Sequence, residues 1–314
     1  MGSELKVHQG AQSFSPESGT VITIGTFDGV HLGHRAILSR VVESAQAMGL
    51  SSVLLTFFPH PRMVVQQQTD LKLLNTLKEK QEHLARIGLD HVVVQPFTTA
   101  FSRLTAVEYV RDILVHQLGA KKIIIGYDHR FGRNRTAHIE DLIEFGKLYG
   151  FSVEEISAQE LDTVAISSTK IRKALGSGDI RMANNYLDYT YRLNGQVAKG
   201  KSIGRSIGYP TANLMVDQSY KLIPKEGVYL TFAHVAGQKC YGLTNIGTNP
   251  TVGGDLQTIE TFFLDIEADL YDHSLQLFFL ERIRDQKHFS SLDDLRAAID
   301  NDVLEARRML MSYD

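Results

Sequence analysis

The sequence predicts an α/β domain with a parallel sheet, followed by an antiparallel β-barrel domain with a C-terminal helix. Up to residue 188, short apolar runs alternate with amphipathic segments of helical length. From residue 189 the helical period stops, and short strand-like runs follow one another between Gly, Asn, Asp and Pro turns. The length of 314 residues also favours two domains. We therefore expect domains at residues 1–188 and 189–314.

The first half opens with an apolar run at 21–27, VITIGTF, which is typical of a buried parallel strand. The segment at 34–49 repeats apolar residues at helical spacing and ends at Gly49, which suits a C-terminal cap. These apolar residues are Ile37, Val41, Ala45 and Met48. The same alternation predicts strands at 52–58, 91–97, 121–128 and 151–157 and helices at 74–88, 105–119 and 138–150. In such parallel sheets, ligands bind beyond the carboxyl ends of the strands, where the strand order switches.

The second half begins after a short helical connector at 180–187, IRMANNYL. Its strands are expected at 191–200, 213–216, 227–235, 239–247, 258–272 and 275–284. A helix closes the chain, and either Ser290 with Asp293 or Ser291 with Asp294 is expected to cap its start. We expect its buried stripe to consist of Leu292, Leu295, Ile299 and Val303.

Composition excludes several classes of protein. A net charge of -3 gives no general attraction to nucleic acid or to an anionic membrane, so neither is expected as a partner. One cysteine, Cys240, excludes an internal disulfide framework and a multi-cysteine zinc site, and we expect it in the core or in a sheet. The first ten residues contain no apolar signal region, and no apolar run reaches membrane-spanning length. We therefore expect a cytoplasmic protein.

The stretch GTFDGVHLGH, residues 25–34, lies where the first strand ends and the first helix begins. Glycines at 25, 29 and 33 allow a sharp turn and close approach of a ligand, and a helix N-terminus attracts anions, so a phosphate site is expected. The glycine spacing fits neither the dinucleotide fingerprint nor the Walker loop. His31 and His34 are three residues apart and can face one point, where imidazoles would hold phosphate oxygens and stabilise a departing pyrophosphate.

Three other interpretations of the two histidines stay open. They could be ordinary packing or surface residues at a helix start. They could bind zinc, although the metalloprotease glutamate and a nearby cysteine are missing. A histidine could also act as a nucleophile that forms a covalent nucleotide.

The pattern Gly-x-Phe-Asp-Gly-x-His-x-Gly-His resembles the first signature of the HxGH nucleotidylyltransferases, which have a Rossmann-like domain. Their second signature is matched by ISSTKIR, residues 166–172. The resemblance implies that His31 and His34 bind the ATP phosphates and that Gly25, Phe27, Asp28 and Gly33 form the nucleotide loop around them. It also implies that Ser168, Thr169 and Arg172 bind the phosphates from the opposite side. From the residues alone, ISSTKIR equally predicts a helix N-cap.

Two further stretches resemble the bacterial bifunctional riboflavin kinase/FMN adenylyltransferase family. They are FFPHP at 57–61 and GYDHRFGRNR at 126–135. The resemblance implies that Asp128 lies at the nucleotide site, although an acid at a strand end is equally a turn residue. Phe58 and His129 depart from the family pattern at these stretches.

The second domain carries KGKSIGRSIGYPTANL, residues 199–214, which is similar to the glycine-rich PTAN region of riboflavin kinases. The resemblance implies that Gly208 and Pro210 line the nucleotide, and that Thr211 and Asn213 bind Mg2+ with the nucleotide phosphates. A turn followed by a strand also explains this stretch. In IETFF, Glu260 matches the general base, while Phe262 replaces the usual His. A glutamate in an apolar strand favours function, although strand alternation could point it to solvent. Segments 245–251 and 269–272, and Arg284 with its neighbours, match the family as well.

The resemblance implies an enzyme with two activities. The barrel phosphorylates riboflavin with ATP to give FMN, and the α/β domain transfers AMP from a second ATP to FMN to give FAD and pyrophosphate, with Mg2+ in both steps. Two alternatives stay open. Only one site is active, as the departures at Phe58 and Phe262 suggest, or the protein is a flavin-binding regulator without turnover.

Overall fold

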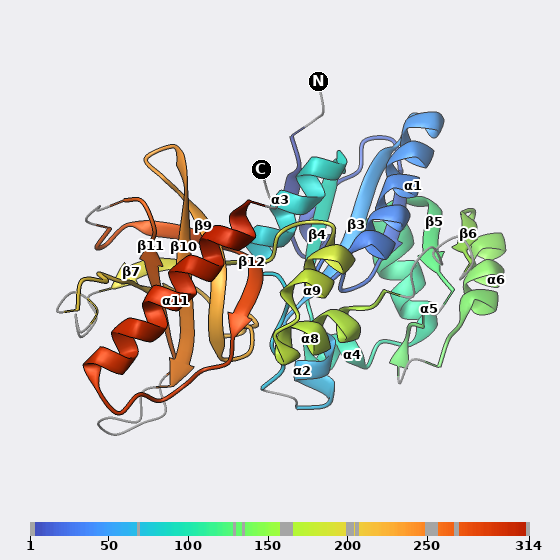
Figure 1. The fold of residues 1–314 in the computed structure, drawn as a ribbon. Helices are drawn as coiled ribbons and strands as arrows, with labels where there is room; N and C mark the ends of the chain where they lie inside the picture. Colours follow the sequence, from blue (N-terminus) through green and yellow to red (C-terminus); the bar gives the residue numbers. More distant parts are fainter. Residues whose placement is uncertain are drawn as a thin grey trace. The chain divides into compact units, whose positions relative to one another are not determined.

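The computed structural model describes residues 4–67, 70–127, 130–133, 136–157, 166–198, 204, 207–248, 257–266 and 270–311. The chain divides into two compact units, Met1–Ser168 and Thr169–Asp314 (Figure 1). Each unit is described by itself. The helices just after residue 168 therefore group with the second unit, whereas the domain boundary expected at 188/189 stays a prediction.

The first unit is built on a six-stranded sheet with the order β1-β4-β3-β2-β5-β6. Its strands are β1 (Lys6–Gln9), β2 (Thr20–Ile24), β3 (Ser51–Phe58), β4 (His91–Pro96), β5 (Ala120–Gly126) and β6 (Ser152–Ile156). Every neighbouring pair is parallel. The expected α/β class and parallel sheet are confirmed.

Strand order reverses beside β2. From β2 the chain passes to β3 and then β4 on one side, and later returns to place β5 on the other side. The carboxyl end of β2 is therefore the switch point at which open α/β sheets bind ligands. The stretch GTFDGVHLGH begins at that end, as the sequence predicted.

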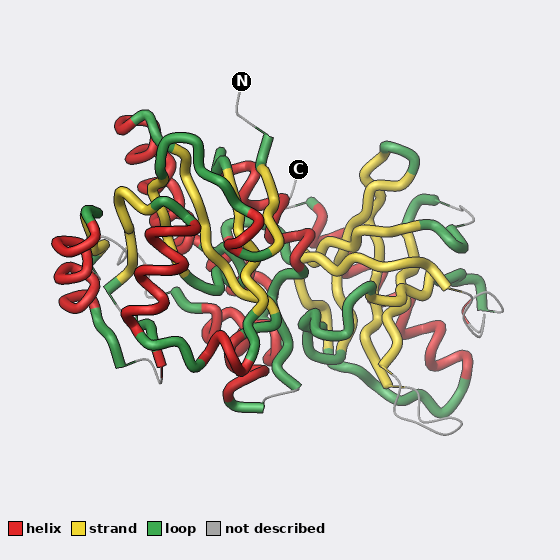
Figure 2. Tube along the Cα trace, turned by 180° about the vertical axis from the view of Figure 1, so that it is seen from behind, coloured by secondary structure: helices red, strands yellow, loops and turns green. Residues whose placement is uncertain are grey.

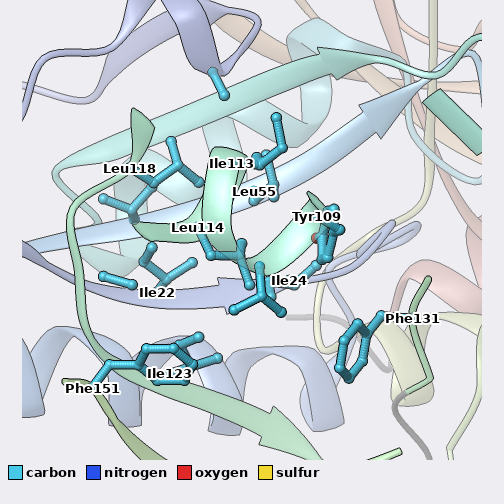
Figure 3. Close-up of a cluster of buried hydrophobic side chains, with 14 of the residues drawn as sticks. Ile22, Ile24, Leu55, Tyr109, Ile113, Leu114, Leu118, Ile123, Phe131 and Phe151 are labelled. Atoms are coloured by element: carbon cyan, nitrogen blue, oxygen red, sulfur yellow. The ribbon is translucent and has the colours of Figure 1, made fainter. Parts of the chain in front are cut away.

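Helices cover both faces of the sheet (Figures 1 and 2). They are α1 (Leu32–Met48), α3 (Leu77–Ile87), η2 (Tyr109–Gln117, π-helical) and α6 (Ile139–Tyr149). Side chains of β2 alternate between two cores. Val21 packs with residues of α1 and α3, and Ile22 packs with η2 and α6 residues in the core that Figure 3 shows. Because β2 is buried on both faces, its sequence is uninterrupted by charge.

Short elements of the first unit escaped the sequence analysis. They are β1, η1 (Ala11–Ser13), α2 (Pro61–Val65) and α4 (Thr99–Ser102). The helix expected at 105–119 is present as α5 (Ala106–Glu108), which leads directly into η2. Strand β1 pairs only with β4 and is mostly exposed, so its sequence KVHQ shows no apolar pattern. The expected helix caps, by contrast, are present, because Gly49 ends α1 at a φ of 65°.

The second unit contains a closed antiparallel barrel with the order β10-β11-β8-β7-β12-β9, as expected. Its strands are β7 (Arg192–Ala198), β8 (Ala212–Val216), β9 (Gly227–Val235), β10 (Gln238–Thr248), β11 (Gln257–Phe263) and β12 (Ser274–Arg284). Two helices, α8 (Ser168–Ser177) and α9 (Ile180–Leu187), precede it. Cys240 is a buried residue of β10, as predicted.

Helix α11 (Leu292–Leu310) packs against β10 and β12 (Figure 1). Ser291 is its N-cap, and Ser291 Oγ accepts a hydrogen bond from Asp294 N–H at 3.1 Å. The stripe expected to be buried was wrong in part, because Leu292 is 55% exposed. The C-terminal half of the helix carries the packing, and its buried residues are Asp302 and Ala306. Within the described part of the chain, no helix is both long and apolar enough to cross a membrane.

Candidate active sites

The loop between β2 and α1 has an unusual backbone. Phe27, Gly29 and Val30 have φ values of 45°, 91° and 37°. This region is unfavourable for side chains with a Cβ, and most of all for a β-branched valine. Of the three glycines expected to permit the turn, Gly29 alone has a positive φ. The other positive φ values of the turn belong to Phe27 and Val30. The surrounding structure must therefore hold this loop in place.

His31 and His34 lie side by side at the start of α1. His31 is the N-cap residue, and its Nδ1 accepts a hydrogen bond from His34 N–H at 3.4 Å. An Nδ1 that accepts leaves the proton of a neutral imidazole on Nε2. The two rings stack with centroids 3.6 Å apart, and the Phe27 ring lies 4.7 Å from the ring of His34. The structure thus brings together the pair that the motif predicted.

Both histidines favour the uncharged form. Burial lowers the pKa of His31 to about 4, although the carboxylate of Asp28 opposes this shift. Burial also lowers the pKa of His34 well below 6.5, and His31 and the ammonium group of Lys80 lower it further. At neutral pH the pair therefore presents neutral imidazoles beside the N-terminus of α1, which itself attracts anions.

Asp28 is 2% exposed and anchors the loop. Its carboxylate accepts hydrogen bonds from Leu74 N–H at 3.0 and 3.1 Å and from Asn75 N–H at 3.3 Å. The Ser168 hydroxyl donates to the Asp28 carbonyl at 2.9 Å, so the second motif touches the first. Ser168 also begins α8, as a helix start at ISSTKIR required.

Several predicted nucleotide contacts are not decided by these positions. Thr169 and Arg172 lie on α8 within the second unit, and their phosphate contacts stay predictions. Gly25 and Gly33 flank the turn, and their roles stay predictions too. Asp128 and His129 lie outside the described residues. Phe58 packs against the core on the α1 side of the sheet, so this departure from the family pattern is accounted for by packing.

Sequence reasoning missed the polar face of α3. Asn75, Thr76, Glu79, Lys80 and His83 are all buried. The Lys80 ammonium group donates to the Thr26 carbonyl of the loop at 2.6 Å. The available signal was Thr-x-x-Glu at residues 76–79, a capping box that the structure contains, followed at once by a lysine. Such a pattern marks a helix start but does not say that the polar residues turn inward.

A second group of polar side chains crosses three strands of the barrel. Asn245 on β10 is directly opposite Glu260 on β11, and Glu260 is opposite Asn213 on β8. Opposed residues of an antiparallel pair share one face of the sheet. The Thr211 hydroxyl donates to Glu260 Oε2 at 3.4 Å. The structure therefore joins PTAN and IETFF into one site of amide, hydroxyl and carboxylate oxygens.

Strand alternation explains where Glu260 points. Thr231, Thr244 and Thr261 are buried, and their hydroxyl groups form a chain with Oγ1–Oγ1 distances of 2.8 Å. Glu260 lies on the opposite face of β11 from Thr261 and is half-buried. The burial argument for its function therefore does not apply, because Glu260 is not in the apolar interior. Its place in the row with two asparagines is the stronger reason.

The loop before PTAN is closed on itself and tied to α11. Tyr209 N–H donates to the Gly204 carbonyl at 2.8 Å, and a Cβ on Gly204 would lie 2.2 Å from the Tyr209 carbonyl oxygen. Gly208 has a φ of 90°. The Tyr209 hydroxyl hydrogen-bonds the Asp300 carboxylate, which raises the pKa of Tyr209. Phe262 packs edge-on against Tyr209, with ring centroids 5.0 Å apart.

Arg284 holds the barrel to its C-terminal helix. Its Nε and Nη2 donate to the Asp302 carboxylate at 2.8 to 3.1 Å, in a bidentate pair that is largely buried. Its Nη1 donates to the Asp285 carbonyl at 3.1 Å. A nucleotide contact from Arg284 stays a prediction, and the contacts seen here link β12 to α11.

Comparisons with known proteins agree with both halves of this picture. The family model of FAD synthetase matches residues 13–170, and that of riboflavin kinase matches residues 187–310. The bifunctional riboflavin kinase/FMN adenylyltransferase of Escherichia coli K12 is 36% identical over 306 residues, which is 96% of this chain and 97% of that protein. The protein of the same name from Listeria monocytogenes is 35% identical, with 91% of each chain covered.

Among solved structures, the crystal structure of a protein named macrolide-efflux protein from Streptococcus pneumoniae is similar over 96% of this chain and 98% of that one. The TM-score is 0.87 and the sequence identity 28%. The fold is thus shared over almost the full length of both chains. The chain belongs to the family of bifunctional riboflavin kinase/FMN adenylyltransferases.

Proposed function

We propose that this chain phosphorylates riboflavin to FMN and then adenylylates FMN to FAD, using ATP in each step. The observation that carries the proposal is that each matched region contains its own complete group of polar side chains. The FAD synthetase match contains the neutral pair His31 and His34 at the switch point of the sheet. The riboflavin kinase match contains Glu260 in a row with Asn213 and Asn245.

In adenylyl transfer the FMN phosphate is the nucleophile and attacks the α-phosphorus of ATP, while the bond to pyrophosphate breaks. An anionic phosphate needs no protein base, so positioning and electrostatic stabilisation are what the chain contributes. His31 and His34 are neutral donors at the N-terminus of α1, and both favour oxygens on which negative charge grows. Their fixed stacking limits reorganisation during the step.

In riboflavin phosphorylation the primary hydroxyl oxygen attacks the γ-phosphorus of ATP, ADP leaves, and the hydroxyl proton needs an acceptor. Glu260 is the carboxylate of the row and is half-buried, so it can reach both solvent and substrate. Thr211 donates to its Oε2, which holds one oxygen and leaves the other available. Asn213 and Asn245 flank it on either side.

Mg2+ fits the donor set of this second site. Thr211 and Asn213 offer hard oxygen atoms next to a carboxylate, which is the chemistry Mg2+ prefers when nucleotide phosphates supply further ligands. We propose that Thr211 and Asn213 would hold the ion. When bound, it neutralises charge on the transferred phosphoryl group. No cluster of three or more His, Cys, Asp or Glu suited to a metal occurs among the described residues.

The test is a time course with purified protein, riboflavin, ATP and Mg2+, in which the flavins are separated by chromatography. We expect FMN to appear first and FAD to follow. FAD from added FMN with no phosphorylation of riboflavin would show that only the first unit is active, and the reverse result would show a silent first unit. Flavin binding without consumption of ATP would establish the regulator instead. A cytoplasmic location also belongs to this proposal and is tested by cell fractionation.

A further inference from the structure

Helix α3 buries polar groups where an amphipathic helix normally buries apolar ones. Its first turn is closed by a capping box between Thr76 and Glu79, and Glu79 is fully buried. Lys80 and His83, on the same buried side, are 6% and 5% exposed. Buried charge is costly unless it is paired, so this face of α3 requires a partner. For Glu79 a partner is the Thr76 N–H at 2.9 Å, and for Lys80 it is the strained loop that precedes α1.

Lys80 reaches the loop at a particular carbonyl. Its ammonium group donates to the Thr26 carbonyl at 2.6 Å, and the Thr56 hydroxyl donates to the same oxygen at 3.2 Å. Thr26 directly precedes Phe27, the first residue with a positive φ. Two donors from α3 and β3 therefore fix the point at which the backbone leaves its ordinary conformation.

Lys80 also acts on His34 through its charge. Burial lowers the pKa of Lys80, but the neighbouring carboxylate of Asp28 opposes the shift and favours the ammonium form. The titratable groups that act on His34 are His31 on its own helix and Lys80 on α3, while Asp28 acts on both His31 and Lys80. Nδ1 of His34 is buried and lacks a hydrogen-bond partner among the described residues. Its protonation is therefore sensitive to the charge on Lys80.

We infer that Lys80 is a positioning residue for adenylyl transfer, which fixes the strained loop through its hydrogen bond to the Thr26 carbonyl. This inference rests on the proposed function. Lys80 touches neither FMN nor ATP in it; it acts through the loop and through His34. The hydrogen bond to the Thr26 carbonyl and the positive charge of Lys80 can be tested separately. Thr56 donates to the same carbonyl oxygen but carries no charge.

The experiment compares Lys80→Met with Thr56→Val in the full chain. Both variants remove a donor to Thr26, but only Lys80→Met removes a charge. We expect Lys80→Met to lower kcat for FAD formation from FMN about tenfold or more, and to move the acidic limb of the pH–rate profile to higher pH because the pKa of His34 rises. Thr56→Val is expected to lower kcat without moving that limb. FMN ionises in the same way in assays of the wild type and of each variant, so its ionisation does not contribute to the difference between their pH–rate profiles.

Riboflavin phosphorylation by the same preparations reports on the integrity of the rest of the chain and should be unchanged. If Lys80→Met reduces it as well, Lys80→Gln, which removes the charge but keeps a shorter polar side chain, takes its place. Equal loss of both reactions in both Lys80 variants would assign Lys80 to folding and overturn the inference. So would an acidic limb that stays in place. If the wild-type protein itself makes no FAD, the proposed function fails before the inference is reached.

Discussion

The two candidate sites differ in how they treat polar groups before any substrate binds. At the β2–α1 loop the polar side chains are buried, with Asp28 at 2% and His31 at 6% exposure. On the barrel, Thr211, Asn213 and Glu260 are half-buried on an outer face. Protein groups have thus replaced water around the first site, whereas water still reaches the second. The charges and dipoles around the first site are therefore fixed by the folded protein. Those around the second site depend more on the charged groups of the bound substrates.

The comparison extends to how each loop is held. The β2–α1 loop is held from within, by hydrogen bonds of Asp28, Lys80 and Ser168. The loop before PTAN is closed by its own hydrogen bond from Tyr209 N–H to the Gly204 carbonyl, and the Tyr209 hydroxyl ties it to Asp300 at an exposed position. Internal ties in a region of low dielectric are stronger than exposed ones. We therefore expect larger changes in pH dependence from variants at the first site than at the second.

The largest effect is expected outside both sites. Asp302→Asn leaves the largely buried guanidinium group of Arg284 without its carboxylate, and breaking a buried pair costs about 3–5 kcal/mol. Denaturant unfolding of the second unit should report this loss. The matched control is Glu305→Gln on the same helix, which breaks an exposed pair with Arg308 and should change the free energy of unfolding far less. Equal losses in both variants would show that the Arg284 pair carries no special stability.

Next in size are the reciprocal active-site variants. His31→Ala should abolish FAD formation from FMN and spare riboflavin phosphorylation, and Glu260→Ala should do the opposite. Loss of one preorganised group of this kind lowers turnover roughly a hundredfold to a thousandfold. Single-step assays of each variant are the measurement, with the other reaction as its control. If either variant damages both reactions equally while remaining folded, the assignment of two separate sites is wrong.

Acid should destabilise the first unit through His31. The pKa of His31 falls from 6.5 to about 4 on folding. Above pH 6.5, His31 is mostly neutral in both the folded and the unfolded state. Between pH 6.5 and about 4, His31 binds a proton in the unfolded state but stays neutral in the folded state, so acid favours unfolding. The free energy of unfolding should therefore drop by roughly 3 kcal/mol over this range on account of His31. His31→Asn, which can still cap α1, should show a shallower drop in denaturant titrations. Parallel curves would exclude the effect.

The smallest effect concerns the outer tie of the barrel loop. Tyr209→Phe removes one hydrogen bond to Asp300, which is worth about 1 kcal/mol. We expect kcat/KM for riboflavin phosphorylation to fall about fivefold, and FAD formation from FMN to stay constant. Asp300→Ala, which removes the acceptor, should have a similar effect, and the double variant should be no worse than either single one. Additive losses would mean that the two residues act separately.

Much of the fold could be predicted because its periodicities are regular. Strand β2 and helix α1 follow the expected pattern of burial, and α9 begins and ends at the residues that the sequence indicated. Edge strand β1 could not be predicted, because it is buried on neither face and so carries no alternation. The expected burial of Leu292 failed for a related reason. The helical period identifies which residues of α11 share one apolar face. It does not show how much of that face the barrel covers, and Leu292 lies beyond the covered part.

The candidate sites could be predicted where a motif lies within one loop, as it does for His31 and His34. They could not be predicted where the partner comes from a distant element. Lys80 reads as a surface residue of an amphipathic helix, and only the tertiary structure turns it towards Thr26. Arg284 likewise reads as a site residue, while its partner Asp302 lies 18 positions further along. Long-range pairing of charges leaves no local trace in a single sequence.

The row of Asn245, Glu260 and Asn213 has a consequence for which length changes the barrel can tolerate. Side chains of a strand alternate, so deleting one residue from β11 ahead of position 260 would turn Glu260 towards the interior and put a neighbour in its place. The same deletion in a connecting loop would leave the row intact. In the barrel, the register of β11 therefore decides which side chains form the site. We expect insertions and deletions between related proteins to lie in the loops of the barrel.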